Sequence, residues 1–444
     1  MAPGSSRTVR RAGTGALAVV VLLTLIGLGG GLATKAACLS SVRTPDGAVS
    51  IDWNDYRQYR DYCYSDTIPL YGLERLADGG FPYKTAWVDP GGGELRYMEY
   101  PVVTGLLQYG VMRVTKAWLV ATGQAENPDP PEVVVYFLIM ALVLAAAWLA
   151  AVLATRPLLE KPWHIALVAL SPLVVVHAFT NFDTLAVALA MGGLLAWARG
   201  RPGWAGLLLG LGAAAKLYPL LLLGPLLVLC WRDHRMRAWR EAALSTLAGW
   251  LVVNGPIAVL YPRGWWEFFR LNSTRAADHD SVYNAISVLT GWPGFDGPLA
   301  AGQSPRILNA VSLGLFLLLC LAIGALGFLA KQRPPLAALT FLTVAAFLLT
   351  NKVWSPQYSL WLVPLAVLAL PKVVPLLAWM SFDAYLWYPR LQYFLGLAEP
   401  GQGTTPEHFV TVVLIRDGLV LLLCALVVAR IVRGRYPERD PAEG

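Results

Sequence analysis

The chain has 444 residues, of which 56% are hydrophobic and only 14% are charged, whereas a soluble domain carries roughly 25% charged residues. These values exclude a soluble enzyme and a disordered chain. Apolar runs recur from residue 16 to residue 432, which also excludes a protein with a single membrane anchor. The formal net charge is +7, from 35 Lys and Arg against 28 Asp and Glu. We interpret this excess as membrane topology rather than nucleic-acid binding, because short cytoplasmic loops collect Lys and Arg.

The apolar runs predict an all-α polytopic membrane protein with about twelve transmembrane helices, at about 20 residues for each span. The first run, from Ala16 to about Ala33, follows Arg7, Arg10 and Arg11. It is longer than the apolar core of a usual signal peptide, so we expect an uncleaved first span with the N-terminus inside. Residues 1–444 would then form a single integral membrane domain. The other predicted spans lie at 133–154, 164–180, 184–198, 203–215, 217–231, 241–260, 307–330, 336–350, 358–371, 373–388 and 409–432.

Short clusters of Lys and Arg follow every second predicted span, which favours a multi-pass plasma-membrane protein with both termini in the cytoplasm. This alternation holds only if the apolar segment 100–122 does not cross the membrane. We therefore predict an interfacial helix on the outer face there, and Arg113 and Lys116 within it would be costly at mid-bilayer. Long loops on a compact body usually carry function. The first outer loop, the second outer loop and the cytoplasmic tail are expected at 35–131, 261–306 and 433–444.

The five cysteines divide into two groups. Cys230, Cys320 and Cys424 lie in apolar runs and are interpreted as small buried hydrophobic residues. Cys38 and Cys63 both fall in the first outer loop, where an oxidising exterior would let them pair. Their separation in space is not given by the sequence, so a disulfide and two free thiols are equally compatible with it.

Polar residues within or at the ends of spans are costly and mark functional sites by default. In this chain nearly all of those in the outer half converge on one predicted membrane face. Asp383, inside the eleventh run, is the exception. The converging residues are Asp66, Glu99, Asn181, Asp183, Lys216, Lys352 and Gln357.

This set suits transfer chemistry at a lipid-borne group. Asp66 suits a general base that accepts a proton from an acceptor hydroxyl, and Lys216 and Lys352 suit neutralisation of a phosphate leaving group. Each residue also has an ordinary structural interpretation, as a turn aspartate or an interfacial lysine. The functional interpretation therefore depends on their joint placement. Tryptophans of the loops could stack on a sugar ring: Trp53, Trp87, Trp265, Trp266, Trp292 and Trp354.

Asp278-His279-Asp280 spells a DxD pattern, which ligates a divalent metal in some enzymes that use sugar nucleotides. Hard-cation sites usually need more oxygen ligands than this pattern supplies. We therefore interpret it as a solvated loop, keep His279 as a candidate substrate-binding residue, and predict no metal and no cofactor.

Five short stretches, in order along the chain, carry a resemblance to a known family. Asp66-Thr67-Ile68-Pro69-Leu70-Tyr71 precedes the turn Gly79-Gly80-Phe81-Pro82-Tyr83. An aromatic segment from Tyr97 to Pro101 follows, then Asn181-Phe182-Asp183, Lys216-Leu217-Tyr218-Pro219 and Ser355-Pro356-Gln357-Tyr358. In order and spacing these stretches resemble glycosyltransferase family 87 over residues 60 to about 365. The sequence departs from the family pattern at Val102, where the family often has a second proline.

The resemblance implies a membrane enzyme of the GT-C type, with extracytoplasmic loop helices around a large helical bundle. It implies a polyprenyl-phosphate sugar as donor, with mannose the best-known sugar, and an actinobacterial envelope glycolipid or glycan as acceptor. Transfer would invert the anomeric centre. The family's catalytic aspartate maps to Asp66, with Asp52 and Asp55 as alternatives because the loop before Asp66 is longer than in the simplest family pattern. Candidate substrate-binding or phosphate-binding residues are Asn181, Asp183, Lys216, Lys352, Gln357, Tyr358, Glu99, Tyr100 and His279.

Two other functions are compatible with the sequence. A transporter or lipid flippase also has many spans with both ends inside, but transporters tend to show repeated halves and mid-membrane polar sites, and neither is evident here. A non-catalytic partner of envelope synthesis is the second. The partners expected under the transferase interpretation are the donor, the acceptor and membrane lipids, without nucleic acid. The sugar, the acceptor and the oligomeric state stay open.

Overall fold

The computed structural model describes residues 14–436 except for residues 46, 90–92 and 301. Arg7, Arg10 and Arg11, and residues 437–444 of the expected tail, lie outside the described residues.

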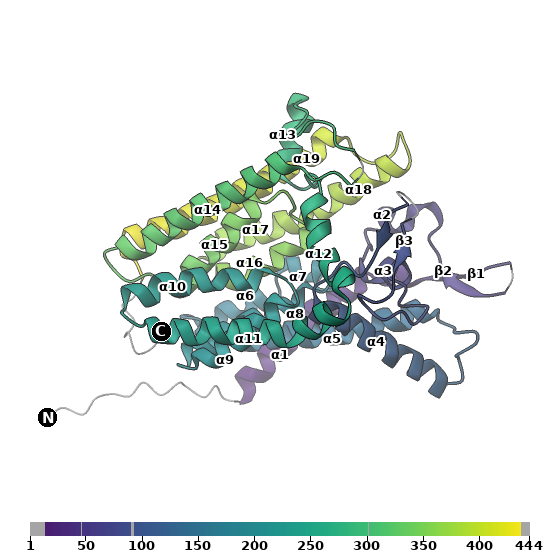
Figure 1. The fold of residues 1–444 in the computed structure, drawn as a ribbon, viewed down its shortest axis with the longest axis horizontal. Helices are drawn as coiled ribbons and strands as arrows, with labels where there is room; N and C mark the ends of the chain where they lie inside the picture. Colours follow the sequence, from purple (N-terminus) through teal and green to yellow (C-terminus); the bar gives the residue numbers. More distant parts are fainter. Residues whose placement is uncertain (1–13, 46, 90–92, 301, 437–444) are drawn as a thin grey trace.

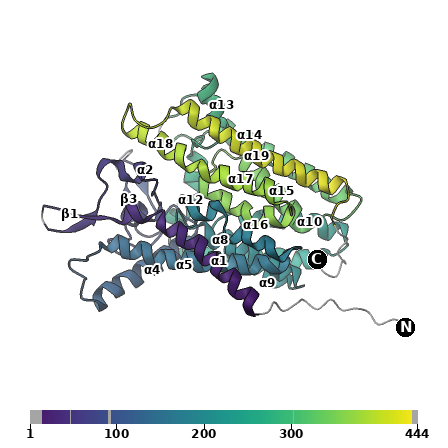
Figure 2. The same ribbon diagram turned by 180° about the vertical axis from the view of Figure 1, so that it is seen from behind.

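Apolar helices run back and forth between the two ends of one bundle (Figures 1 and 2). Each predicted span coincides with a helix or with a helix broken once, because apolar runs of this kind must satisfy their backbone hydrogen bonds internally. The helices of the bundle are α1 (Thr14–Ala33), α5 (Glu132–Thr155), α6 (Ile165–Ala169), α7 (Pro172–His177), α8 (Asp183–Ala198), α9 (Pro202–Ala213), α10 (Leu223–Arg232), α11 (Met236–Leu260), α14 (Arg306–Leu329), α15 (Leu336–Thr350), α16 (Ser359–Ala369), α17 (Val373–Tyr385) and α19 (Pro406–Val432).

Five helical segments of the described chain are long and apolar enough to cross a membrane. The predicted class, an all-α membrane protein, is thereby confirmed, whereas the crossing of all twelve segments stays a prediction. Six further apolar segments are shorter, at 10–17 residues. The five long ones are Gly15–Ala33, Glu132–Leu158, Met236–Leu260, Arg306–Leu329 and Pro406–Val432.

Helices α9 and α11 are in unusually close contact. Gly206 and Gly210 are four residues apart on α9, and a Cβ atom at either would collide with the backbone carbonyl of Ala242 or Thr246 on α11. Small residues at this spacing let two helix backbones approach closely. Close packing then stabilises the helix pair, since the hydrophobic effect does not act between helices in lipid. Lys216 follows three residues after the end of α9, one of these two closely packed helices.

The two long loops and the segment before α19 gather at one end of the bundle, on the right in Figure 1. Two short antiparallel hairpins lie among them, with Ser41 opposite Ile51 in one and Trp87 opposite Arg96 in the other. We call this the loop end. Its elements are η1 (Ala36–Leu39), β1 (Ser41–Arg43), β2 (Val49–Ile51), η2 (Asn54–Tyr56), α2 (Arg57–Arg60), α3 (Thr67–Leu73), β3 (Trp87–Val88), β4 (Leu95–Arg96), α4 (Val102–Ala121), α12 (Pro262–Thr274), α13 (Val282–Thr290) and α18 (Trp387–Ala398).

The segment 100–122 is helical, as α4, and it is not among the five segments long and apolar enough to cross a membrane. Its Lys116 forms an ion pair of 2.9 Å with Glu132 at the start of α5. Its interfacial position stays a prediction.

Three chain reversals present polar residues at the loop end. They are the turn between α7 and α8, the turn between α9 and the 3-10 helix η5 (Tyr218–Leu222), and the segment between α15 and the 3-10 helix η6 (Pro356–Tyr358). Prolines near the start of α7, η5 and η6 fix where helical structure begins, because proline favours the first positions of a helix and cannot continue one. The first two reversals carry Asn181 and Lys216, respectively, and Gln357 lies in η6, directly after the third.

Cys38 and Cys63 form a disulfide with a Cα–Cα distance of 5.5 Å, so one of the two possibilities left by the sequence is confirmed. Cys230 is buried, as predicted. The prediction was wrong for Cys320 and Cys424, which are only half-buried, because α14 and α19 turn much of their surface outward.

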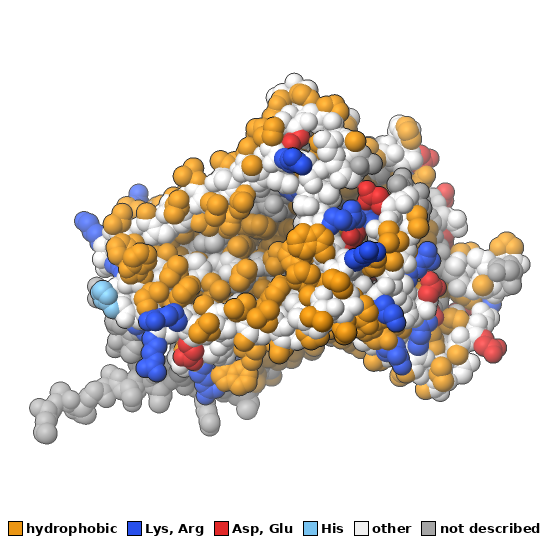
Figure 3. Space-filling model, in the orientation of Figure 1, with side chains coloured by type: hydrophobic (Ala, Val, Ile, Leu, Met, Phe, Trp, Pro, Cys, Tyr) orange, Lys and Arg blue, Asp and Glu red, His pale blue; other side chains and the backbone are white. Residues whose placement is uncertain are grey.

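Charged side chains on the face shown in Figure 3 concentrate towards its two ends, with a largely hydrophobic surface between them. At the end opposite the loops, Arg333 forms an ion pair with Asp233, and Arg232 donates to the backbone carbonyl of Gly327. We call this the basic end. Exposed basic residues that follow helix ends here are Arg199, Arg201, Lys331, Lys372 and Arg433.

Candidate active site

A cavity of about 850 Å³ opens at the loop end, between the first outer loop, α12, η6 and α18. Sites for small molecules are typically concave clefts of this size with a few convergent polar groups. Both signs of charge line it. The acidic lining residues are Asp66, Glu94, Glu99 and Asp278, and the basic ones are Arg96, Lys216, Arg275 and Arg390.

Asp66 is hydrogen-bonded to the turn between α7 and α8. Its backbone N–H donates to the Thr180 carbonyl over 2.8 Å, and the Ser65 hydroxyl donates to the Phe179 carbonyl over 2.7 Å. The amide Nδ2 of Asn181 donates to Asp66 Oδ2 over 2.6 Å. Three bonds between two distant chain segments therefore hold the Asp66 carboxylate in the cavity.

Asn181 connects Asp66 with Tyr100. Its Nδ2 also donates to the Tyr100 hydroxyl over 2.8 Å, and its own Oδ1 accepts from the backbone N–H of Phe182. Burial, together with the nearby Asp66 carboxylate, raises the pKa of Tyr100 well above its ordinary value. Tyr100 therefore stays a neutral phenol at the cavity wall, close to Asp66.

Lys216 is the lysine that reaches the cavity, and Asp183 lies behind it. Asp183 is 1% exposed, and its Oδ2 lies 3.5 Å from the Lys216 ammonium. Its Oδ1 accepts a hydrogen bond of 2.8 Å from the Trp361 indole. The ammonium also lies 5.0 Å from the Tyr358 ring centroid and 5.4 Å from that of Tyr100, within cation–π range. Asp183 thus holds the lysine charge in place.

Lys352 does not reach the cavity. Its ammonium donates to the backbone carbonyls of Ser273 and Arg275. Burial and the neighbouring Arg275 lower the pKa of Lys352 to about 8. The lysine supports the segment after α12, and it is the Arg275 side chain of that segment that lines the cavity.

Of the remaining predicted residues, three line the cavity and one does not. Glu99, Gln357 and Tyr358 line the cavity. Burial raises the pKa of Glu99, and the positive charges of Arg275 and Arg96 oppose this shift. His279 lies behind the wall, where its Nδ1 is 3.2 Å from the Tyr393 hydroxyl.

The two alternative bases lie outside the cavity. Asp55 is exposed on η2, and Asp52 forms an ion pair of 2.7 Å with Arg57. Asp66 is the one of the three aspartates that lines the cavity.

The interpretation of the DxD pattern as a solvated loop was wrong for Asp280, which is fully buried. Its Oδ2 accepts a hydrogen bond of 2.8 Å from Arg390 Nε, and its backbone carbonyl accepts one from Arg416. Arg416 in turn stacks 3.7 Å from the centroid of the Trp354 ring. The Asp280 carboxylate is therefore paired with Arg390, and Arg416 binds the backbone carbonyl of the same residue. Within the described residues, no cluster of three or more His, Cys, Asp and Glu is arranged to hold a metal ion, and the absence of a metal stays a prediction.

Other predicted residues have structural surroundings. Asp383 lies apart from the cavity, as expected, and accepts a hydrogen bond from the Trp379 indole. Of the six tryptophans considered for sugar stacking, Trp53 lines the cavity. Further aromatic rings on its wall come from residues that the sequence did not single out, namely Tyr59, Tyr64, Phe268, Trp387 and Phe394.

Sequence reasoning missed three arginines that line the cavity. Arg275 adjoins Asn272-Ser273-Thr274, Arg390 follows the eleventh apolar run, and Arg96 lies one residue before the aromatic segment. For Arg96 and Arg390, the position next to a candidate site segment or to the end of an apolar run was the available signal, whereas Arg275 had no such neighbour. Their approach to one another depends on loop packing, which no local pattern encodes.

Comparison with known proteins agrees with this architecture. Residues 130–356, just over half of the chain, match the family model of glycosyltransferase family 87. No curated protein matches the chain. The matched region includes Asn181, Asp183 and Lys216, and it ends at η6. This confirms the resemblance inferred from the motifs, and the chain belongs to glycosyltransferase family 87.

Proposed function

We propose that this membrane glycosyltransferase moves a sugar, mannose in the first instance, from a polyprenyl-phosphate donor to an envelope glycolipid or glycan on the outer face. Membership of the family supports a glycosyltransferase over a transporter or lipid flippase. The GT-C arrangement, the donor and the inversion of the anomeric centre are parts of the proposal.

One observation carries it. The Asp66 carboxylate lies in the same cavity as Lys216, Arg275 and Arg390. An inverting displacement needs one base near the acceptor hydroxyl and cationic groups near the leaving phosphate. This cavity contains both kinds of group.

In the proposed reaction, the acceptor hydroxyl gives its proton to Asp66 while its oxygen bonds to C1 of the donor sugar. The bond between C1 and the phosphate oxygen breaks, and polyprenyl phosphate leaves with the electron pair. Lys216 acts as a point charge towards the leaving phosphate, whereas Arg275 and Arg390 can each offer two parallel N–H groups. The aromatic wall at Tyr59 and Trp53 is available to pack against a sugar ring.

The decisive test is Asp66→Asn, which keeps the size of the side chain and its place beside Asn181 but removes the base. We expect transfer from polyprenyl-phosphate mannose in isolated membranes to fall by about 10²-fold or more, because general-base catalysis contributes on this scale. Protein abundance in the membrane should not change.

Two neighbouring aspartates provide a matched control and a test of the alternative base. Asp61→Asn changes an exposed residue of the same loop and should leave transfer unaltered. Asp55→Asn tests the alternative base. Full activity of Asp66→Asn, or loss of activity in Asp55→Asn alone, would contradict the assignment.

The acceptor is identified by a separate measurement. The glycolipids and glycans of a strain that lacks the protein should miss one product and accumulate its unglycosylated precursor. An unchanged profile would count against the enzyme, and a missing product with a different sugar would replace mannose in the proposal.

A further inference from the structure

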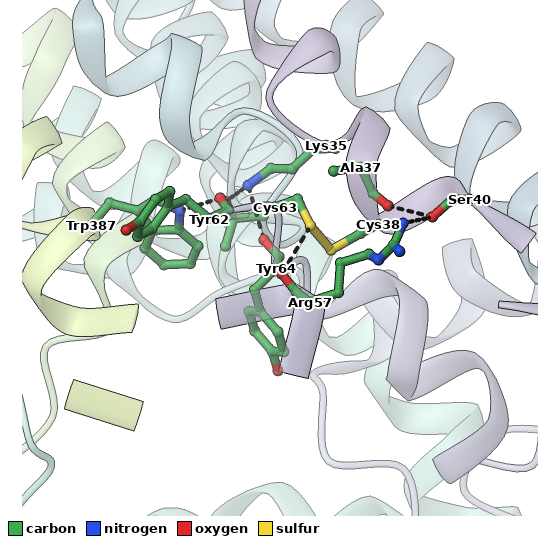
Figure 4. Close-up of a disulfide and its surroundings, with 10 residues drawn as sticks. Lys35, Ala37, Cys38, Ser40, Arg57, Tyr62, Cys63, Tyr64 and Trp387 are labelled. Atoms are coloured by element: carbon green, nitrogen blue, oxygen red, sulfur yellow. Dashed lines mark hydrogen bonds between the residues drawn. A yellow bond between two sulfur atoms is a disulfide. The ribbon is translucent and has the colours of Figure 1, made fainter. Parts of the chain in front are cut away.

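A buried lysine connects the end of α1 with the segment that carries Asp66. Lys35 follows α1 by two residues and is 0% exposed. Its ammonium donates to the Tyr64 carbonyl over 2.9 Å and to the Thr180 hydroxyl over 3.1 Å (Figure 4 shows the bond to Tyr64). Tyr64 and Thr180 belong to the two segments that meet at Asp66, so this one amine bridges both of them.

The surroundings of Lys35 are costly for a charge. Among the ion pairs of the described residues none includes Lys35, and its ammonium lies 5.0 Å from the centroid of the Trp387 ring. Burial lowers the pKa of Lys35 to about 7, and the charge of Asp66 opposes this shift. Taking an ammonium out of water is energetically costly. A buried amine in such a place indicates a role beyond filling space.

A disulfide also joins the end of α1 to the segment that carries Asp66. Cys38 lies three residues after Lys35, and its partner Cys63 immediately precedes Tyr64. Figure 4 shows the disulfide and the Lys35 amine together, near Tyr64. The segment before Asp66 is thus linked to the end of α1 by two bonds, the Cys38–Cys63 disulfide and the hydrogen bond from Lys35 to the Tyr64 carbonyl.

We propose that Lys35 is a positioning residue for Asp66 and that the Cys38–Cys63 disulfide acts with it. Together they fix how far the segment from Tyr64 to Asp66 reaches into the cavity. The inference rests on the proposed function of Asp66 as the base. Neither Lys35 nor the cysteines line the cavity, so their effect passes through Tyr64 and Thr180 and not through contact with the substrate.

The expected signature is a loss of turnover without a loss of donor binding. Lys35→Met keeps the apolar stem and removes the ammonium. We expect its kcat to fall by about tenfold or more while KM for the donor stays within about twofold, because small displacements of a reacting group reduce rate more than affinity. Lys35→Arg, which restores charge and donors, should recover part of the lost kcat. Lys84→Met, a change at an exposed lysine of the same loop, is the matched control and should have no effect.

A measurement on the unmutated protein covers the case in which Lys35→Met does not fold. Treatment with a phosphine reductant converts the disulfide to two thiols, and the mass gained on alkylation reports how far this has gone. We expect kcat to fall as the Cys38–Cys63 disulfide is reduced. The variant with both Cys38→Ser and Cys63→Ser should start at the lower value and be insensitive to the reductant.

Asp66→Asn in the same assay separates the two proposals. If Asp66→Asn keeps its activity, the proposed function of Asp66 fails, whatever Lys35 does. If Asp66→Asn is inactive but fully reduced protein or Lys35→Met turns over like the unmodified protein, the positioning role alone is overturned. A rise in donor KM at unchanged kcat would also overturn it.

Discussion

The two ends of the bundle carry charge in different ways. At the basic end, Arg199, Lys331 and Lys372 are exposed, as expected for the short cytoplasmic loops that the sequence predicts there. At the loop end, Asp183 and Lys216 form a pair whose side chains are 1% and 13% exposed. Buried charges are expensive unless they are paired and hydrogen-bonded. The difference teaches that burial, rather than the number of charges, distinguishes the loop end, where we propose the active site, from the basic end.

The strongest test of this comparison is to break the buried pair. Asp183→Ala leaves the Lys216 ammonium without its carboxylate, and removal of one partner of a buried pair costs about 3–5 kcal/mol. We expect a large drop in the thermal unfolding temperature of detergent-purified protein, together with loss of transfer.

A double variant shows whether the pairing itself is responsible. Asp183→Asn combined with Lys216→Met removes both charges, so it should be more stable than Asp183→Ala although equally inactive. Unfolding of Asp183→Ala at the temperature of the unmodified protein would contradict the proposed cost of an unpaired charge.

The second largest effect is expected at Asp280, which orients Arg390. Asp280→Asn removes the negative charge that faces the Arg390 guanidinium, so the arginine should lose its fixed direction towards the cavity. We expect kcat/KM for the donor to fall by about tenfold, the scale of one charge-assisted hydrogen bond. Kinetics of Asp280→Asn against Asp78→Asn, a change at an exposed aspartate, measure this.

The same pattern allows a test of metal dependence. A chelator should leave transfer by the unmodified protein unchanged, since Asp280 is fully buried and its carboxylate is paired with Arg390. Loss of activity with a chelator and recovery with Mg²⁺ would restore the DxD pattern as a metal site.

The sequence predicted the ends of the bundle better than the details of the cavity. Apolar runs and basic clusters are local signals, so the helices and the grouping of Asp66, Asn181 and Lys216 could be inferred from them. The places of Lys352 and Asp280 could not. Each depends on which backbone carbonyl or guanidinium packs against it, and that is decided by contacts between segments far apart in the chain.

A smaller, pH-dependent effect is expected for Lys352. Burial lowers its pKa from the ordinary value of 10.5 to about 8. Between these two values the unfolded state binds more protons than the folded state, so stability rises with pH in this window. Thermal unfolding from pH 8 to pH 10 should therefore favour the unmodified protein increasingly over Lys352→Met. An identical pH profile for the two proteins would show that folding does not lower the pKa of the Lys352 amine.

The smallest effect is expected at the basic end. The side chains of Arg333 and Asp233 are 24% and 14% exposed, so their pair is more accessible than that of Lys216 and Asp183. Pairs near the surface contribute about 0–1 kcal/mol. Arg333→Gln should therefore change the unfolding temperature slightly and leave transfer unaltered, whereas Arg275→Gln at the cavity should reduce transfer at similar stability. If the two variants lost activity equally while both stayed folded, a place at the cavity would not distinguish the loop end from the basic end, because a distant arginine would then matter as much as one at the cavity.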